Sequence, residues 1–177
     1  MSQASGAGNA IYALARWFCY IGGTIMTALA IMSVYSVAIR ALGFKPVQGD
    51  FELVQIGCAV AVASFLPWCQ LKGGNIIVDF FTMGASARTQ SRLDAFGALT
   101  VAVVLGIMAW RTGVGAASVK SAGESSMLMG VPIWWAYAGM VPGLALGAAA
   151  GVLTAVEHWR AAAGGVAAAD AKPGQAA

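Results

Sequence analysis

Glu52 is the residue whose type and position could carry chemistry, because it is the one formal charge between Phe51 and Leu71. An ionisable side chain in a membrane helix can carry protons, bind a cation, or hold a partner subunit through a charge-assisted hydrogen bond. A carboxylate at a helix N-terminus is also stabilised by the helix dipole without any further role. The structural role is the simpler interpretation of Glu52, and Asp79 is more simply a solvated interfacial residue than a site.

Enzymatic or redox chemistry in the bilayer would need other groups, such as paired histidines, a metal-binding cluster, or a nucleophile beside a base. The one histidine, His158, follows the last predicted span, and no acidic pair falls within a span. Cys19, Cys58 and Cys69 lie inside predicted spans without metal-type spacing. We therefore expect a chain that is not an enzyme and has no catalytic residue, cofactor or metal site of its own.

The composition indicates an all-α membrane protein. Of 177 residues, 59% are hydrophobic and 10% are charged, whereas about a quarter of the residues in a soluble domain are charged. The net charge of +3 is scattered along the chain, which argues against a nucleic-acid partner. The length fits four spans of about 20 to 25 residues each. We expect one four-helix transmembrane domain over residues 1–160 and a disordered tail over residues 161–177.

Apolar runs predict four transmembrane helices, at about residues 17–39, 51–71, 93–112 and 132–156. The third run stays compatible with a helix as far as Ala122, which is longer than a bilayer is thick. Gly73 and Gly74 end the second helix. The run 76–84 then has apolar residues at helical spacing with Asp79 opposite, which predicts a short interfacial helix between the second and third spans.

Small residues predict close helix packing in two of the spans. In the last span, glycine recurs every four residues, at Gly139, Gly143, Gly147 and Gly151. Such a repeat drifts by only about 40° per step, so we expect one flat groove that faces one partner. In the second span, Gly57, Ala61 and Ser64 form another line of small residues. The sequence leaves open which of these faces meets another subunit and which is internal.

The tryptophans and the basic residues indicate how the chain lies in the membrane. The tryptophans all lie near predicted helix ends, as interfacial anchors do: Trp17, Trp68, Trp110, Trp134, Trp135 and Trp159. If the N-terminus is cytoplasmic, six lysines and arginines lie inside and four lie outside. We therefore expect both termini in the cytoplasm.

Taken in order, several features resemble the small membrane subunit (DctQ-like) of tripartite ATP-independent periplasmic (TRAP) transporters, over about residues 11–160. They are Arg40, Glu52, the run FLPWCQ from Phe65, the run GGNIIVD from Gly73, Ser126-Met127-Leu128, Val131-Pro132-Ile133-Trp134, Tyr137 and Pro142-Gly143. Asn75 departs from the family, which commonly has histidine after the two glycines. The motif makes Gly73, Gly74, Asn75 and Asp79 further candidates for helix packing or partner contact.

The resemblance implies a scaffold subunit in the bacterial inner membrane. In this family, the small subunit packs against a large membrane subunit. Together with a periplasmic substrate-binding protein, the two form a sodium-coupled importer, commonly of organic acids. The sodium and substrate sites would lie in the large subunit. The alternative is an autonomous four-helix, proton-coupled exchanger of the small multidrug-resistance type that works through Glu52. The almost wholly apolar middle of each span favours the scaffold.

Overall fold

Four long helices make up most of the chain in the computed structural model, which describes residues 6–45, 48–73 and 87–164. The helices are α1 (Gly6–Ala41), α2 (Asp50–Leu71), α4 (Ala87–Ala122) and α5 (Trp134–Gly164). Each contains a segment that is long and apolar enough to cross a bilayer, which confirms the all-α class and the four predicted spans. The predicted interfacial helix at 76–84 lies outside the described residues.

Glycine in the left-handed region follows three of these helices, α1, α2 and α4. Gly43 follows α1 with φ of 78°, and Gly123 follows α4 with φ of 67°. At α4, the N–H of Gly123 donates to the Lys120 carbonyl at 3.3 Å, and the N–H of Glu124 donates to the Val119 carbonyl at 3.3 Å. These two bonds satisfy carbonyls that the last turn leaves without partners, and only glycine adopts this conformation without strain. The third helix therefore runs through to Ala122.

The helices are longer than the expected spans. Both α1 and α4 have 36 residues, or about 54 Å at 1.5 Å per residue, against a hydrocarbon core of about 30 Å. Helix α1 begins at Gly6, well before the expected start at Trp17. Helix α5 begins at Trp134, two residues after Pro132, and continues to Gly164, so residues 161–164 of the expected tail are helical.

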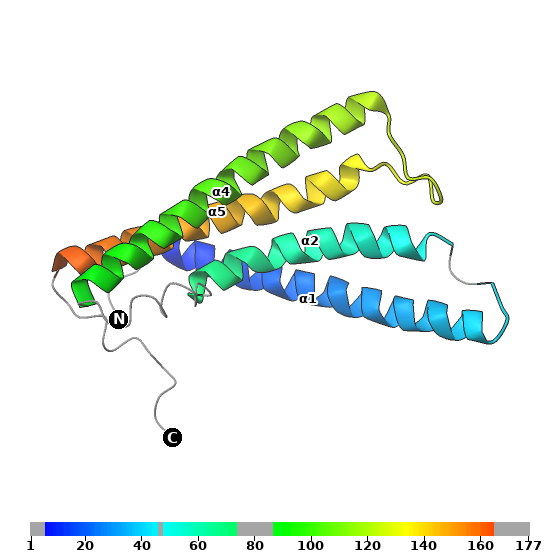
Figure 1. Ribbon diagram of the computed structural model, residues 1–177, viewed down its shortest axis with the longest axis horizontal. Coiled ribbons are helices and arrows are strands. Elements are labelled where there is room, and N and C mark those ends of the chain that lie inside the picture. The colour runs from blue at the N-terminus through cyan, green and yellow to red at the C-terminus, as the bar shows by residue number, and fades with distance from the viewer. Residues whose placement is uncertain (1–5, 46–47, 74–86, 165–177) are drawn as a thin grey trace, which may run out of the picture.

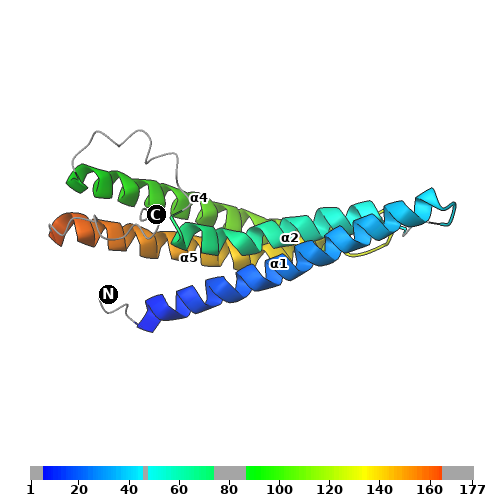
Figure 2. The same ribbon diagram turned by 90° about the horizontal axis from the view of Figure 1, so that it is seen from below.

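The helices form a row in the order α1, α2, α5, α4 (Figure 1). Helices α1 and α2 make one antiparallel hairpin, α4 and α5 make the other, and α2 and α5 run parallel where the hairpins meet. Helix α1 begins and helix α5 ends at the same end of the molecule (Figure 1). The view from below shows that the first turns of α1 and α4 lie apart (Figure 2).

The contacts inside the row are made mainly by small side chains. One cluster joins α2, α4 and α5 through Ala63, Leu105, Ala109 and Leu144, and another joins α1, α2 and α5 through Ala15, Leu71 and Ala150. Many large apolar side chains instead point outward; Val34 is 70% exposed and Ile107 is 54% exposed. Exposed apolar side chains are what a helix presents to lipid or to another membrane subunit.

Candidate partner and helix-packing site

Glu52 lies in the first turn of α2 and binds the loop that joins α4 to α5. The Ser126 hydroxyl donates a hydrogen bond to Glu52 Oε2. The backbone N–H of Leu128 donates to Oε1 at 3.1 Å, and that of Met129 donates to Oε2 at 3.3 Å. Both carboxylate oxygens thus accept hydrogen bonds from one loop, and charge-assisted bonds of this kind are stronger than neutral ones. Glu52 ties the first hairpin to the second.

The α4–α5 loop, residues 123–133, is itself folded by backbone hydrogen bonds. The N–H of Ser126 donates to the Val131 carbonyl at 2.9 Å, and the N–H of Gly130 donates back to the Ser126 carbonyl at 3.1 Å. The N–H of Ile133 donates to the Glu124 carbonyl at 3.2 Å. The loop therefore presents its free N–H groups at its tip, where Glu52 accepts them.

Gly49 gives the same loop a place to pack. It precedes α2 with φ of 75° and is buried. A Cβ atom at Gly49 would lie 2.7 Å from Met129 Sδ and closer still to Met129 Cγ. Any larger residue would therefore collide with Met129 and also be strained in its backbone. Gly49 and Glu52 together form the contact site on which the α4–α5 loop packs.

Asp50, the neighbouring carboxylate, ties α2 to α1 instead. The hydroxyl of Ser36, a side chain only 1% exposed, donates to Asp50 Oδ2 at 2.6 Å. Arg40 Nη2 lies 3.5 Å from the same oxygen, and the N–H of Phe51 donates to Oδ1 at 2.8 Å. Sequence reasoning missed this contact. The signal was present, because Ser36 and Arg40 are one turn apart and share a face of α1.

These carboxylates sit at helix ends and are occupied by structural contacts. Within residues 6–45, 48–73 and 87–164, no three His, Cys, Asp or Glu side chains come together in a way that could hold a metal ion. The arrangement of Asp50 and Glu52 therefore supports bracing of helices and a loop.

The first half of the glycine line on α5 packs against α2. A Cβ atom at Gly139 would lie 3.0 Å from Val60 Cγ2, and one at Gly143 would lie 2.7 Å from the carbonyl carbon of Ala63 and closer still to its oxygen. Contact with backbone cannot be relieved by moving a side chain. Gly143 is therefore the closest approach of α5 to α2 among these positions.

The second half of the line turns toward α4. A Cβ atom at Gly147 would lie 3.1 Å from Leu105 Cδ1, and one at Gly151 would lie 2.9 Å from the Cβ of Ala102. The glycine line thus contacts two neighbouring helices in succession, whereas the sequence predicted one partner. Both neighbours belong to this chain, so these glycines serve its internal packing.

Pro67 explains the close contact at Gly143. Proline has no N–H, so Pro67 cannot donate to the Ala63 carbonyl four residues earlier in α2. The freed Ala63 oxygen is the atom nearest to a Cβ position on Gly143. A neighbouring helix can compensate such a carbonyl in a membrane, and Cα–H groups are weak donors at helix interfaces. Pro67 and Gly143 both belong to the motifs quoted above, and the Ala63 carbonyl, which Pro67 leaves without a donor, lies against Gly143.

The small residues of α2 pack against α1. A Cβ atom at Gly57 would lie 2.6 Å from Leu29 Cδ1. Ala61 is fully buried, and its carbonyl oxygen lies 3.0 Å from a Cβ position on Gly22 of α1. Gly73 follows α2 with φ of 69° and faces open space. Gly74, Asn75 and Asp79 lie outside the described residues.

The tryptophans fall into two groups. Four are well exposed on the helix surfaces, namely Trp17, Trp110, Trp135 and Trp159. The other two are each covered by a lysine, with Lys72 Nζ 5.0 Å above the Trp68 ring and Lys120 Nζ 4.8 Å above the Trp134 ring. Trp110 lies ten residues before Lys120 on α4, which is about 15 Å along the helix. Trp110 and Trp134 therefore lie at different depths along the α4–α5 hairpin.

Gln70 is a buried polar residue whose side-chain nitrogen lacks a hydrogen-bond acceptor among the described residues. Its side chain is 7% exposed, and its Nε2 atom has no acceptor among the described residues. A buried donor left unsatisfied costs about 1–3 kcal/mol. Nothing in the sequence gave a reason to expect an unsatisfied donor at Gln70.

Comparison with known proteins agrees with this geometry. A family model described as Tripartite ATP-independent periplasmic transporters, DctQ component, matches residues 29–161. The match contains Arg40, Glu52, Pro67, Ser126 and Gly143. No curated protein and no solved structure matches the chain. Since the family model covers well over half of the sequence, the chain belongs to the DctQ component family of the tripartite ATP-independent periplasmic transporters.

Proposed function

We propose that this chain is the small scaffold subunit of a TRAP-type, sodium-coupled secondary transporter that imports an organic-acid-like solute. Its partners would be a large membrane subunit, which holds the sodium and substrate sites, and a periplasmic substrate-binding protein. The chain would lie in the inner membrane of a bacterium with both termini in the cytoplasm. The observation that carries the proposal is the match of residues 29–161 to the DctQ component family.

The geometry around Glu52 supports a bracing role over the alternative of an autonomous exchanger. An exchanger that worked through Glu52 would need the Glu52 carboxylate to bind and release protons and substrate in turn. Both oxygens instead accept hydrogen bonds from the α4–α5 loop. A subunit that supports a pathway in another protein fits these facts better.

The packing also indicates which helix surfaces remain uncovered and could contact the large subunit. Gly139, Gly143 and Gly57 are in contact with helices of this chain. The outer edges of the row, on α1 and α4, keep large apolar side chains exposed, for example Val34 and Ile107. Exposed apolar side chains of this kind are typical of interfaces between membrane subunits and of contact with lipid. We therefore infer that the large subunit packs against an outer edge.

Affinity isolation from native membranes tests the proposal. The full-length chain carries a C-terminal tag, is extracted in a mild detergent, and its companions are identified by mass spectrometry. We expect one large multi-pass membrane protein in an amount equal to the bait. A tagged four-helix protein from another family, expressed in the same cells, is the control. Recovery of copies of this chain alone would contradict the proposal.

A further inference from the structure

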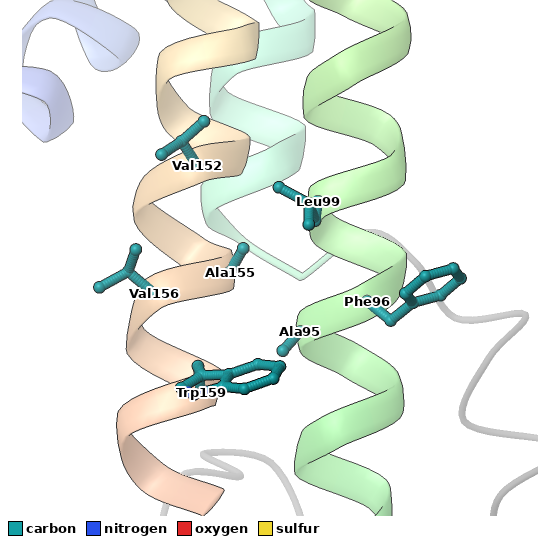
Figure 3. A pocket seen from close by; sticks show the side chains of 7 residues that line it. All are labelled: Ala95, Phe96, Leu99, Val152, Ala155, Val156 and Trp159. Atoms are coloured by element: carbon teal, nitrogen blue, oxygen red, sulfur yellow. The ribbon is translucent and has the colours of Figure 1, made fainter. Parts of the chain in front are cut away.

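A shallow apolar groove lies on the α4–α5 hairpin, near the end at which α5 stops (Figure 3). It encloses about 200 Å³. It is lined by Ala95, Phe96 and Leu99 of α4 and by Val152, Ala155, Val156 and Trp159 of α5. Ala95 and Ala155, the small residues between the two helices, form its floor, and the Trp159 ring extends from α5 toward α4 across one end (Figure 3).

Two arginines continue the groove beyond Trp159. Arg92 precedes Ala95 and Phe96 by three and four residues, so it lies on the same face of α4 one turn further on. Arg160 follows Val156 by four residues and continues the α5 side. Both arginines are exposed. Their long side chains can therefore reach from apolar surface to a polar headgroup layer.

The helix register brings the two arginines to one level. Gly151 of α5 packs against Ala102 of α4. Arg160 lies nine residues after Gly151, and Arg92 lies ten residues before Ala102. Because the helices are antiparallel, these steps lead in the same direction and end within about 1.5 Å of each other along the axis. The two arginines therefore lie at one level along the α4–α5 hairpin, beyond the residues that line the groove.

The nearest acidic residues of the same helices do not line the groove. Glu157 lies on the side of α5 that faces α1, where its charge acts on Tyr12. Asp94 shares a face of α4 with Ala98 and Leu105, which are buried, and it makes a polar interaction of its own. None of the described residues that line the groove is acidic.

We propose that this groove binds one anionic phospholipid, with an acyl chain between α4 and α5 and the phosphate held by Arg92 and Arg160. Guanidinium groups bind phosphate oxygens through paired hydrogen bonds. Basic pockets between transmembrane helices are typical sites for anionic headgroups, and tryptophan favours the same depth. The lining of the groove is wholly apolar, as contact with an acyl chain requires, and the arginines at its end match the charge of an anionic headgroup.

Lipid titration followed by native mass spectrometry tests the proposal. The full-length chain is stripped of lipid in detergent and titrated with dioleoyl phosphatidylglycerol or with dioleoyl phosphatidylcholine. We expect one phosphatidylglycerol to bind at least about tenfold more tightly than phosphatidylcholine, because two arginines contact the anionic headgroup. The double variant Arg92→Gln and Arg160→Gln should lose this preference. Arg111→Gln, an exposed arginine elsewhere on α4, is the matched control and should keep it.

A second variant separates the groove from the charge. Val156→Trp fills the groove from a side chain that is already 43% exposed, so it leaves the buried contacts between α4 and α5 in place. It should weaken the tight binding of one lipid while the arginines remain. Equal affinity for both lipids, or an equal loss in Arg111→Gln, would overturn the proposal. So would a photo-cross-linker at Val156 that captures another membrane protein in native membranes.

Discussion

Gly143→Ala adds one methyl group at the place where α5 comes closest to α2. The new Cβ would lie 2.7 Å from the Ala63 carbonyl carbon and closer still to the oxygen. Because these atoms are backbone, the helices themselves must move apart. Overpacking of this kind costs about 1–3 kcal/mol, and contact with backbone places it near the upper value. Alanine in place of glycine returns about 1 kcal/mol of helix propensity, so the free energy of unfolding should fall by about 2 kcal/mol.

The matched control is Gly106→Ala on α4. A Cβ atom there would lie 3.9 Å from Ala148 Cβ, which is an ordinary contact. This variant keeps the gain in helix propensity without the collision, so we expect it to be more stable than wild type by about 0.5–1 kcal/mol. The two variants make the same chemical change. They should nevertheless shift the stability in opposite directions.

Unfolding in mixed micelles of SDS and a mild detergent, followed by tryptophan fluorescence, measures both variants. The transition of Gly143→Ala should move to a lower SDS fraction than that of wild type. The transition of Gly106→Ala should move to a higher one. If Gly143→Ala is as stable as Gly106→Ala, the contact with Ala63 does not exist in the folded chain and the reasoning is refuted.

Three further changes test the loop and the buried polar group. Glu52→Gln leaves one side-chain oxygen for three donors, so hydrogen exchange of the α4–α5 loop amides should become faster; Glu124→Gln in the same loop should leave it unchanged, and equal rates in both variants would refute the contact. Gly49→Ala should cost about 1–2 kcal/mol of stability for its backbone conformation alone, plus the collision with Met129. In the double variant Gly49→Ala and Met129→Ala, the chain should regain only the stability that the collision cost. If the double variant is no more stable than Gly49→Ala alone, Met129 does not pack against Gly49. Gln70→Leu removes the unsatisfied donor and should stabilise the lone chain by about 1 kcal/mol; a loss of stability would mean that the Gln70 amide is bonded after all.

The spans were predictable because the bilayer sets a minimum length for an apolar helix. Hydropathy alone placed α2 at 51–71, against Asp50–Leu71 in the structure. It could not place the start of α1 or the end of α5, because alanine-rich helical turns beyond the most apolar stretch give no strong signal in hydropathy. Their helical propensity and their packing decide those ends.

The candidate site was predictable only in its local part. The spacing of Gly139, Gly143 and Gly151 gave a face of α5, but spacing cannot tell which helix will cover that face. The structure shows that α2 covers Gly139 and Gly143, that Gly147 lies against both α2 and α4, and that α4 covers Gly151. Glu52 was singled out from its position at a helix start, whereas its partner Ser126 is 74 residues away. No local rule connects residues so far apart in the chain.

The most direct test of a scaffold role is transport by defined components in liposomes. The chain alone should move no solute under either a sodium or a proton gradient, whereas the chain together with the large membrane subunit, the binding protein and a sodium gradient should accumulate the substrate. Proton-driven transport by the lone chain, abolished by Glu52→Gln, would contradict the account and establish the exchanger instead.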